Sequence, residues 1–209
     1  MKVTVIGAGN MGSAFVKQLL QAGHQVKVAA RSADKTSKLA PQAGLSVVPL
    51  AGAAAEADVV VLATSYEQAV PALKAVGNLS GKVVLDITNP LTADYMGLTI
   101  GHSTSAAEEI AKAVPEATIV KGFNTVFAQV LAGGADLGAG QKVNVFLAAD
   151  QAEGKQAVAA LATSMGFVVV DAGPLKNARY LEPVAGLNIY LGYGAGLGTA
   201  MAPAWIHKA

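Results

Sequence analysis

Three glycines near the start of the chain constrain its fold more than any other feature. Gly7, Gly9 and Gly12 form the pattern G-x-G-x-x-G directly after the short apolar run Lys2–Ile6. In a strand–turn–helix unit the first glycine permits the tight turn, the second leaves room for a pyrophosphate, and the third lets the helix pack on the strand. The helix N-terminus then directs N–H groups and its positive dipole end at the phosphates. The expected dinucleotide contacts here are Gly7, Gly9, Asn10, Met11 and Gly12.

The end of the second predicted strand, 25–30, indicates which dinucleotide binds. An NAD site has Asp or Glu there, whose carboxylate accepts the ribose 2′-hydroxyl. Here the strand is followed by Arg31 and Ser32, and Lys35 comes soon after. A guanidinium holds a phosphate through two charge-assisted hydrogen bonds, and a serine hydroxyl can add a third. The sequence therefore predicts NADP(H) bound by Arg31, Ser32 and Lys35; the alternative is a solvated surface arginine.

Composition excludes several other classes of protein. The 209 residues suffice for one well-buried domain with an appendage. A net charge of +1 and 14% charged residues give no electrostatic case for nucleic acid or a membrane surface. Without cysteine the chain has no disulfide and no thiolate metal site, and its three histidines are too dispersed to predict a metal centre. No export signal precedes the first strand, so we expect the cytoplasm.

One long apolar stretch, 183–206, carries no Asp, Glu, Lys or Arg side chain. Its length would suit a membrane span. Five glycines, two prolines and the polar Asn188 lower its hydrophobicity and interrupt any helix. We therefore expect it to pack over the cofactor crevice or against a second subunit. We also expect the protein to be a homodimer.

Apolar runs and helical spacings alternate along the rest of the chain. This alternation predicts an α/β fold with a doubly wound, mostly parallel sheet. After the first two strands, further strands are expected at 46–48, 59–63, 82–86, 118–122, 143–148 and 167–171. Helices are expected at 10–22, 33–43, 51–57, 67–76, 106–113 and 125–131, and another is capped by Asp150 with Glu153. The expected organisation is a Rossmann-like NADP-binding domain over 1–172 and a helical, glycine-rich extension over 173–209.

Small polar residues follow two neighbouring predicted strands. In such sheets ligands bind at the carboxyl ends of the strands, where the winding reverses. Thr64 and Ser65 are therefore expected to contact the riboses and phosphates of the dinucleotide. Asn89 is expected to hydrogen-bond the nicotinamide ribose or carboxamide, and Pro90 to stiffen its turn. The alternative for each loop is ordinary turn chemistry and helix capping.

A third loop and one histidine complete the candidate site. Phe123, Asn124 and Thr125 follow the next strand and are expected to bound the space for hydride transfer. His102 lies in a loop near the predicted cleft, where it could donate to a carboxylate or phosphate of the substrate; the alternative is polar surface.

Three charged residues are expected to have no role in the site. Arg179 and Glu182 are one helical turn apart and are predicted to pair with each other. Lys121, at a strand end, is predicted to lie in solvent.

The order of motifs along the chain resembles one family of reductases. These motifs are IGAGNMG, ARS, DITNPL, STSAAEEIA, VKGFNT and DAGPLKNARYLEP. The chain resembles the deazaflavin (coenzyme F420)-dependent NADP reductases and the related cytosolic domains of membrane metalloreductases. Pyrroline-carboxylate reductases share the opening motif, and hydroxyisobutyrate-type dehydrogenases use a catalytic lysine. Both need a longer helical second domain, for which this chain lacks length.

The resemblance implies hydride exchange between NADP(H) and a second flat ring in one cleft. By the family pattern the glycine loop, Arg31, Ser32, Thr64 and Ser65 hold NADP(H). The acceptor is implied to lie against the loops after the later strands and the carboxyl-terminal run. Such a reaction requires no acid or base, because the protein supplies proximity, orientation and exclusion of water. The acceptor itself stays open between a deazaflavin and FMN or FAD, and an alternative function is an NADP(H)-binding redox sensor without turnover.

Overall fold

The computed structural model describes residues 1–31, 36, 39 and 42–205. Ser32, Lys35 and most of the helix predicted over 33–43 lie outside the described residues. The strands are β1 (Lys2–Ile6), β2 (Gln25–Ala29), β3 (Leu45–Val47), β4 (Val59–Leu62), β5 (Val83–Asp86), β6 (Thr118–Lys121), β7 (Asn144–Leu147) and β8 (Val168–Asp171). The helices are α1 (Asn10–Gln21), α3 (Tyr66–Ala75), α4 (Ala106–Ala113), α5 (Ala128–Gly133), α6 (Ala152–Ser164) and α7 (Ala178–Ile189), with a 3₁₀ turn η1 (Leu175–Asn177) and a π-helix η2 (Tyr190–Gly194).

Six parallel strands form the central sheet, in the order β3-β2-β1-β4-β5-β6. The chain winds outward from β1 to β3 and then returns to β4 on the other side of β1. The winding therefore reverses between β1 and β4, and a crevice opens at the carboxyl ends of these two strands. The predicted doubly wound α/β fold is confirmed.

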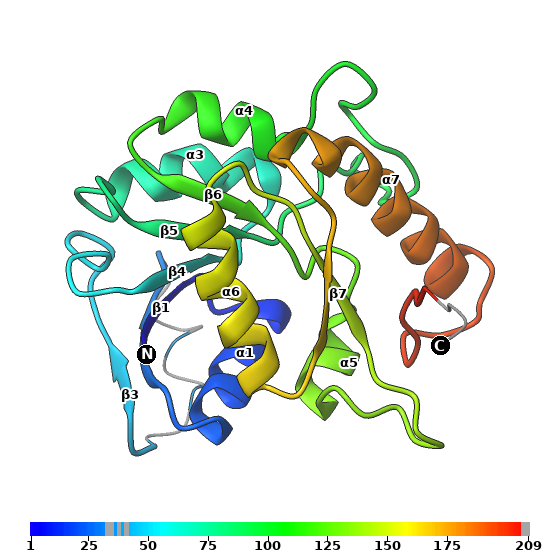
Figure 1. Cartoon of the computed structure of the whole chain (residues 1–209), viewed down its shortest axis with the longest axis horizontal. Helices are drawn as coiled ribbons and strands as arrows, with labels where there is room; N and C mark the ends of the chain where they lie inside the picture. The colour runs from blue at the N-terminus through cyan, green and yellow to red at the C-terminus, as the bar shows by residue number, and fades with distance from the viewer. Residues whose placement is uncertain (32–35, 37–38, 40–41, 206–209) are drawn as a thin grey trace.

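Helices cover both faces of this sheet (Figure 1). Val5, Val28 and Val61 point to the face covered by α1, α5 and α6, and they belong to the larger hydrophobic core. Their neighbours Ile6 and Leu62 point to the opposite face, which α3 and α4 cover. Because successive strand residues alternate between two buried faces, the strands read as continuous apolar runs.

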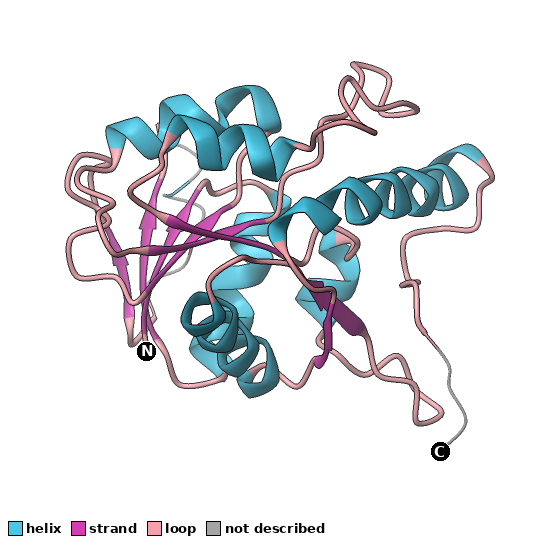
Figure 2. Cartoon of the chain, turned by 45° about the horizontal axis from the view of Figure 1, so that its top comes forward, coloured by secondary structure: helices cyan, strands magenta, loops and turns pink. Residues whose placement is uncertain are grey.

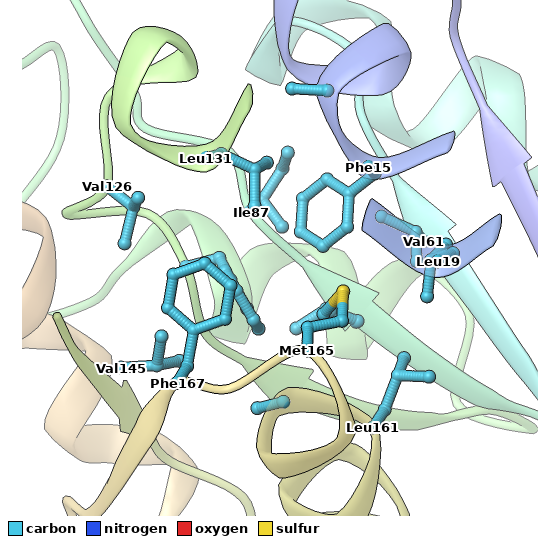
Figure 3. Packing of buried hydrophobic residues seen from close by; sticks show 14 of the residues in the cluster. Phe15, Leu19, Val61, Ile87, Val126, Leu131, Val145, Leu161, Met165 and Phe167 are labelled. Carbon is cyan, nitrogen blue, oxygen red and sulfur yellow. The ribbon is translucent and has the colours of Figure 1, made fainter. Parts of the chain in front are cut away.

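Aromatic side chains fill the centre of the larger core. The ring of Phe123 meets those of Phe15 and Phe167 edge to face, at centroid distances of 5.0 Å and 5.2 Å. Figure 3 shows Phe15, Phe167 and Met165 packed between α1, α5 and α6. This packing fixes α1, and with it the glycine turn, against the sheet.

The last two strands leave the central sheet. β7 and β8 form a separate parallel pair, and an isolated antiparallel bridge between Lys121 and Ala148 joins this pair to β6. Beyond them, α7 extends away from the sheet layers (Figure 2). Within the described part of the chain, no helix has both the length and the hydropathy needed to cross a membrane.

Three of the predicted helical features are wrong. Residues 51–57 form successive turns, because Gly52 has φ 77° and the amides of Ala53, Ala55 and Ala57 bond three residues back. The helix predicted at 125 begins at Ala128. Asp150 does not cap α6.

The Asp150 carboxylate instead accepts from the amide of Leu175, 2.9 Å away, and so binds η1. The predicted start of α4 is confirmed, since the Ser105 hydroxyl accepts from the amide of Glu108. Capping at α4 is a local interaction, whereas the bond of Asp150 joins segments far apart in the sequence.

Candidate functional site

The glycine turn has the geometry that its sequence requires. Gly7 has φ 106°, and a Cβ atom there would lie 2.3 Å from the carbonyl oxygen of Ala63. A Cβ on Gly12 would lie 2.0 Å from the carbonyl oxygen of Gly7. At Gly9 an added Cβ would meet nothing within 4 Å. Gly7 and Gly12 therefore allow the backbones to approach, while Gly9 faces open space suited to a bound phosphate.

Two adjoining cavities form a groove over the carboxyl ends of β2, β1, β4 and β5. One has a volume of about 420 Å³ and the other of about 760 Å³. Both are lined by Gly9, Ala63, Thr64 and Ser65, so they meet at the glycine turn. The smaller cavity extends to Arg31, and the larger one extends past Asn10 and Met11 to Asn89. The groove thus runs from a cation to an amide, across the N-terminus of α1.

Among the described residues that line the smaller cavity, Arg31 is the charged one. Its side chain is exposed and makes no ion pair with another residue in the described ranges. A guanidinium in the wall of such a cavity can hold an anion bidentately. This arrangement fits the 2′-phosphate that distinguishes NADP from NAD.

A hairpin after β5 walls the far end of the larger cavity. Leu91 and Leu98 form an antiparallel bridge, and the Thr92 hydroxyl accepts from the amide of Gly97 at 2.9 Å. Tyr95, at the tip, has φ 63° and exposes 62% of its surface. The hairpin residues that line the cavity are Leu91, Thr92, Ala93, Tyr95 and Thr99. The sequence analysis did not identify them, although a long connection such as the nineteen residues between the end of β5 and the start of α4 commonly carries function.

Asn89 and Asn124 join the two loops that follow β5 and β6. Asn89 Nδ2 donates to the carbonyl of Asn124 at 2.8 Å, and Asn124 Nδ2 donates to Oδ1 of Asn89 at 3.0 Å. Asn124 also donates to the carbonyl of Leu181 on α7, while the carbonyl of Thr125 accepts from Asn188. Of these two loops, only Asn89 among the candidate residues lines the larger cavity. Asn124 and Thr125 hold α7 against the sheet.

Two buried polar atoms near these loops have no hydrogen-bond partner among the described residues: Oγ1 of Thr88 and Oδ1 of Asn124. Thr88 lines the larger cavity. A buried polar atom without a partner costs free energy, so Thr88 Oγ1 offers a bond to a ligand in the cavity.

The other acceptor-site candidates lie away from the cavities. Phe123 is fully buried in the aromatic core, and Pro90 is buried beneath the hairpin, where its carbonyl accepts from the amide of Thr99. His102 is exposed at φ 59° and lines neither of the two cavities. Phe123 and Pro90 therefore do not line the predicted acceptor pocket.

The prediction that Lys121 lies in solvent is wrong, because this residue is fully buried. Its Nζ lies 3.0 Å from Oδ2 of Asp86 and 2.9 Å from Oε1 of Glu182. Burial alone would lower the pKa of Lys121, but the two carboxylates outweigh it and raise that pKa, so the ammonium stays charged. We call Lys121, Asp86 and Glu182 the buried charge cluster.

Glu182 also binds the start of α4. Its carboxylate accepts from the amides of Ala106 and Ala107 at 2.9 Å and 3.2 Å. The predicted pair between Arg179 and Glu182 is therefore wrong. Arg179 reaches Glu108 instead, with Nε and Nη2 at 2.9 Å and 2.7 Å from its carboxylate oxygens. These contacts fasten α7 to α4 and to β6.

The described part of the groove contains the features of a dinucleotide site. The described residues include no cluster of three or more His, Asp or Glu side chains that could hold a metal ion. The groove combines the glycine turn, which is suited to phosphate, with a cation at one end and a polar, partly aromatic cavity at the other. Such a site can orient two rings for hydride transfer.

Comparisons with known proteins agree with this chemistry. A family model described as NADP oxidoreductase, coenzyme F420-dependent, matches residues 2–90. The chain is 29% identical over 209 residues to the F420-dependent NADP reductase of Methanothermobacter thermautotrophicus, covering 91% of this chain and 89% of that protein. It is 30% identical over 184 residues to Metalloreductase STEAP3 of Rattus norvegicus, covering 88% of this chain. The chain spans only 36% of the length of that metalloreductase.

A solved structure matches along almost the full chain. It is that of a protein from Arthrobacter sp. FB24 provisionally named an F420-dependent NADP reductase. The TM-score is 0.84 at 31% identity, with 95% of this chain and 96% of the other covered. This chain therefore belongs to the coenzyme F420-dependent NADP oxidoreductase family.

Proposed function

We propose that this protein transfers a hydride between NADP(H) and a flat redox-active ring, a deazaflavin or a flavin such as FMN or FAD. The observation that carries the proposal is the continuous groove from Arg31 across the glycine turn to Asn89. The order of the chemical groups along it corresponds to adenosine 2′-phosphate, pyrophosphate and nicotinamide riboside. The names of the matched reductases support the same cofactor.

Each part of the groove has a proposed task. Arg31, with Ser32 and Lys35, binds the 2′-phosphate, and the N-terminus of α1 binds the pyrophosphate. Thr64 and Ser65 line both cavities, so their hydroxyls reach the middle of the dinucleotide. Asn89 is held by its bonds to Asn124 and offers its remaining polar capacity to the nicotinamide end.

The acceptor would enter the larger cavity from the side of the hairpin. The cavity volume of about 760 Å³ exceeds what a nicotinamide ring alone needs, and Tyr95 provides an aromatic face at its edge. We propose that residues 173–209 act as an extension that shapes this end, because Asn124 and Thr125 are bonded to α7. Bound NADPH supplies the hydride, while the chain fixes the geometry and excludes water.

Stopped-flow oxidation of NADPH against a panel of acceptors tests the proposal. The panel contains a deazaflavin, FMN, FAD and a quinone, each measured with and without protein. We expect a deazaflavin or flavin to be reduced well above the background rate. Tight NADPH binding with no accelerated oxidation by any of them would contradict hydride transfer and favour the redox-sensor alternative.

We also propose that the protein is a homodimer. Large apolar side chains stand exposed along α7, η2 and the segment after them: Tyr180, Leu187, Tyr190, Tyr193, Leu197 and Trp205. Exposed apolar surface of this extent marks an association site, and a second copy is its simplest occupant. Light scattering at micromolar concentration is expected to give twice the 21.0 kDa of one chain. A monomeric mass would contradict the homodimer without affecting the proposed reaction.

A further inference from the structure

The buried charge cluster carries more negative than positive charge. The side chains of Asp86 and Glu182 accept hydrogen bonds at both of their oxygens: from Lys121, from two amides of α4 and from the amide of Thr88. Carboxyl groups that only accept hydrogen bonds are ionised. Two carboxylates and one ammonium leave a formal charge of −1, which the N-terminus of α4 offsets only in part.

The cluster lies directly behind the wall of the larger cavity. Lys121 Nζ donates to the carbonyl of Thr88, and the amide of Thr88 donates to Oδ1 of Asp86 at 2.8 Å. Thr88 and its neighbour Asn89 themselves line the cavity. One residue therefore separates the buried charges from the space into which the nicotinamide end of the groove opens.

Positive charge does not compensate the cluster from the cavity side. Among the described residues that line the larger cavity, Glu67 is charged and there is no lysine or arginine. The nearby cations Lys112 and Arg179 are paired with Glu109 and Glu108.

Tyr66, directly after Ser65, responds to this field. Burial is the largest cause that raises the pKa of Tyr66, and the charges of Glu109, Glu182 and Asp86 raise it further. The negative potential thus reaches the carboxyl end of β4 as well as that of β5. The groove is consequently polarised, with Arg31 at one end and uncompensated negative charge at the other.

We propose that the buried charge cluster biases the bound nucleotide toward its oxidised form, NADP⁺. This inference rests on the proposed function, which assigns the nicotinamide to the larger cavity. When the C4–H bond breaks, the hydride leaves for the acceptor with both bonding electrons, and the nicotinamide ring gains one positive charge. Negative charge behind Thr88 stabilises that cationic ring and the transition state leading to it, but does nothing for the neutral dihydronicotinamide.

The test compares the dissociation constants of NADP⁺ and NADPH by calorimetry, with no acceptor present. Glu182→Gln removes one charge while keeping the shape of the side chain. We expect the ratio of the NADPH constant to the NADP⁺ constant to fall at least about five-fold, because the lost negative charge attracts the cationic ring of NADP⁺ and not the neutral ring of NADPH. Glu182→Asp keeps the charge and is expected to retain the ratio. Asp86→Asn is expected to lower the ratio in the same direction as Glu182→Gln.

The matched control is Glu153→Gln, which removes an exposed carboxylate from the first turn of α6, a residue that lines neither cavity of the groove. Its ratio is expected to stay within about two-fold of the unmutated value, because solvent screens an exposed charge. Circular dichroism confirms that each variant is folded. An unchanged ratio in Glu182→Gln or Asp86→Asn, with both nucleotides still bound, would overturn the inference while leaving the proposed function intact.

The unmutated protein provides a second test, which does not depend on the folding of any variant. It is expected to bind NADP⁺ more tightly than NADPH, and tighter binding of NADPH would overturn the bias. If neither nucleotide binds, the proposed function itself fails, and the inference fails with it.

Discussion

Nζ of Lys121 on β6 lies 2.9 Å from Oε1 of Glu182 on α7, and both side chains are at most 1% exposed. With Asp86 on β5, this pair connects the sheet to the carboxyl-terminal helix and to the start of α4. A fully buried ion pair is costly to break, because the remaining charge has no solvent to stabilise it.

Lys121→Met is therefore expected to lower the free energy of unfolding by about 3–5 kcal/mol, since it leaves two carboxylates buried without their cation. Urea denaturation measures the loss. Lys112→Met is the control, because it breaks an exposed lysine–glutamate pair and is expected to leave the unfolding midpoint nearly unchanged. Equal midpoints for the two variants would show that the buried charge cluster does not hold the fold together.

Alanine at two of the fingerprint glycines is expected to change two different properties: protein stability at Gly12 and nucleotide affinity at Gly9. Gly12→Ala would bring a Cβ atom to 2.0 Å from the carbonyl oxygen of Gly7, so it should cost about 2 kcal/mol of stability or more. Gly9→Ala meets nothing within 4 Å, so the melting temperature should not change. Its methyl group would occupy the phosphate space, and NADPH affinity should fall about ten-fold or more.

Thermal melting and nucleotide titration of both glycine variants check this prediction. Normal NADPH binding by Gly9→Ala would show that Gly9 does not face the nucleotide.

Arg31→Asp is expected to weaken NADPH binding by roughly 2 kcal/mol or more, about thirty-fold. The substitution removes charge-assisted hydrogen bonds to the 2′-phosphate and introduces a repulsive carboxylate. NADH lacks that phosphate, so its affinity serves as the internal control and should change little. A parallel loss for both nucleotides would mean that Arg31 does not read the 2′-phosphate.

The pair of Arg179 and Glu108 is expected to make stability depend on acid pH. Hydrogen bonds from the Arg179 guanidinium hold the pKa of Glu108 below its ordinary value of 4.5. The stabilisation is therefore complete above pH 4.5 and disappears as the pH falls through the lower, folded-state pKa. Glu108→Gln should lower the urea midpoint at pH 7, and its difference from the unmutated protein should be smaller at an acid pH well below 4.5. A difference that persists undiminished at that pH would argue against the pair.

The parts of the fold predicted correctly depend on local interactions. Gly7 is required by its own φ of 106°, Gly12 by its contact with Gly7 in the same turn, and Ser105 caps α4 through a bond three residues along the chain. Continuous apolar runs identified the strands, because both faces of the sheet are covered. The helix predicted at 51–57 is wrong. The alanines there favour a helix, but the left-handed conformation of Gly52 interrupts it.

The parts that could not be predicted depend on partners distant in sequence. Lys121 was predicted to lie in solvent because neither Asp86 nor Glu182 is near it along the chain. Asn124 was expected in the acceptor pocket, and it binds Asn89 and α7 instead. The hairpin around Tyr95 lacks apolar periodicity, and its threonine and aspartate turn chemistry does not reveal that it borders a cavity.

The central claim is that the groove between Arg31 and Asn89 binds NADP(H) through its 2′-phosphate. Calorimetric titration of the unmutated protein with NADPH and NADH tests it most directly. NADPH is expected to bind at least about ten-fold more tightly than NADH, with saturation at micromolar protein. Equal affinities, or no binding of either nucleotide, would contradict the account.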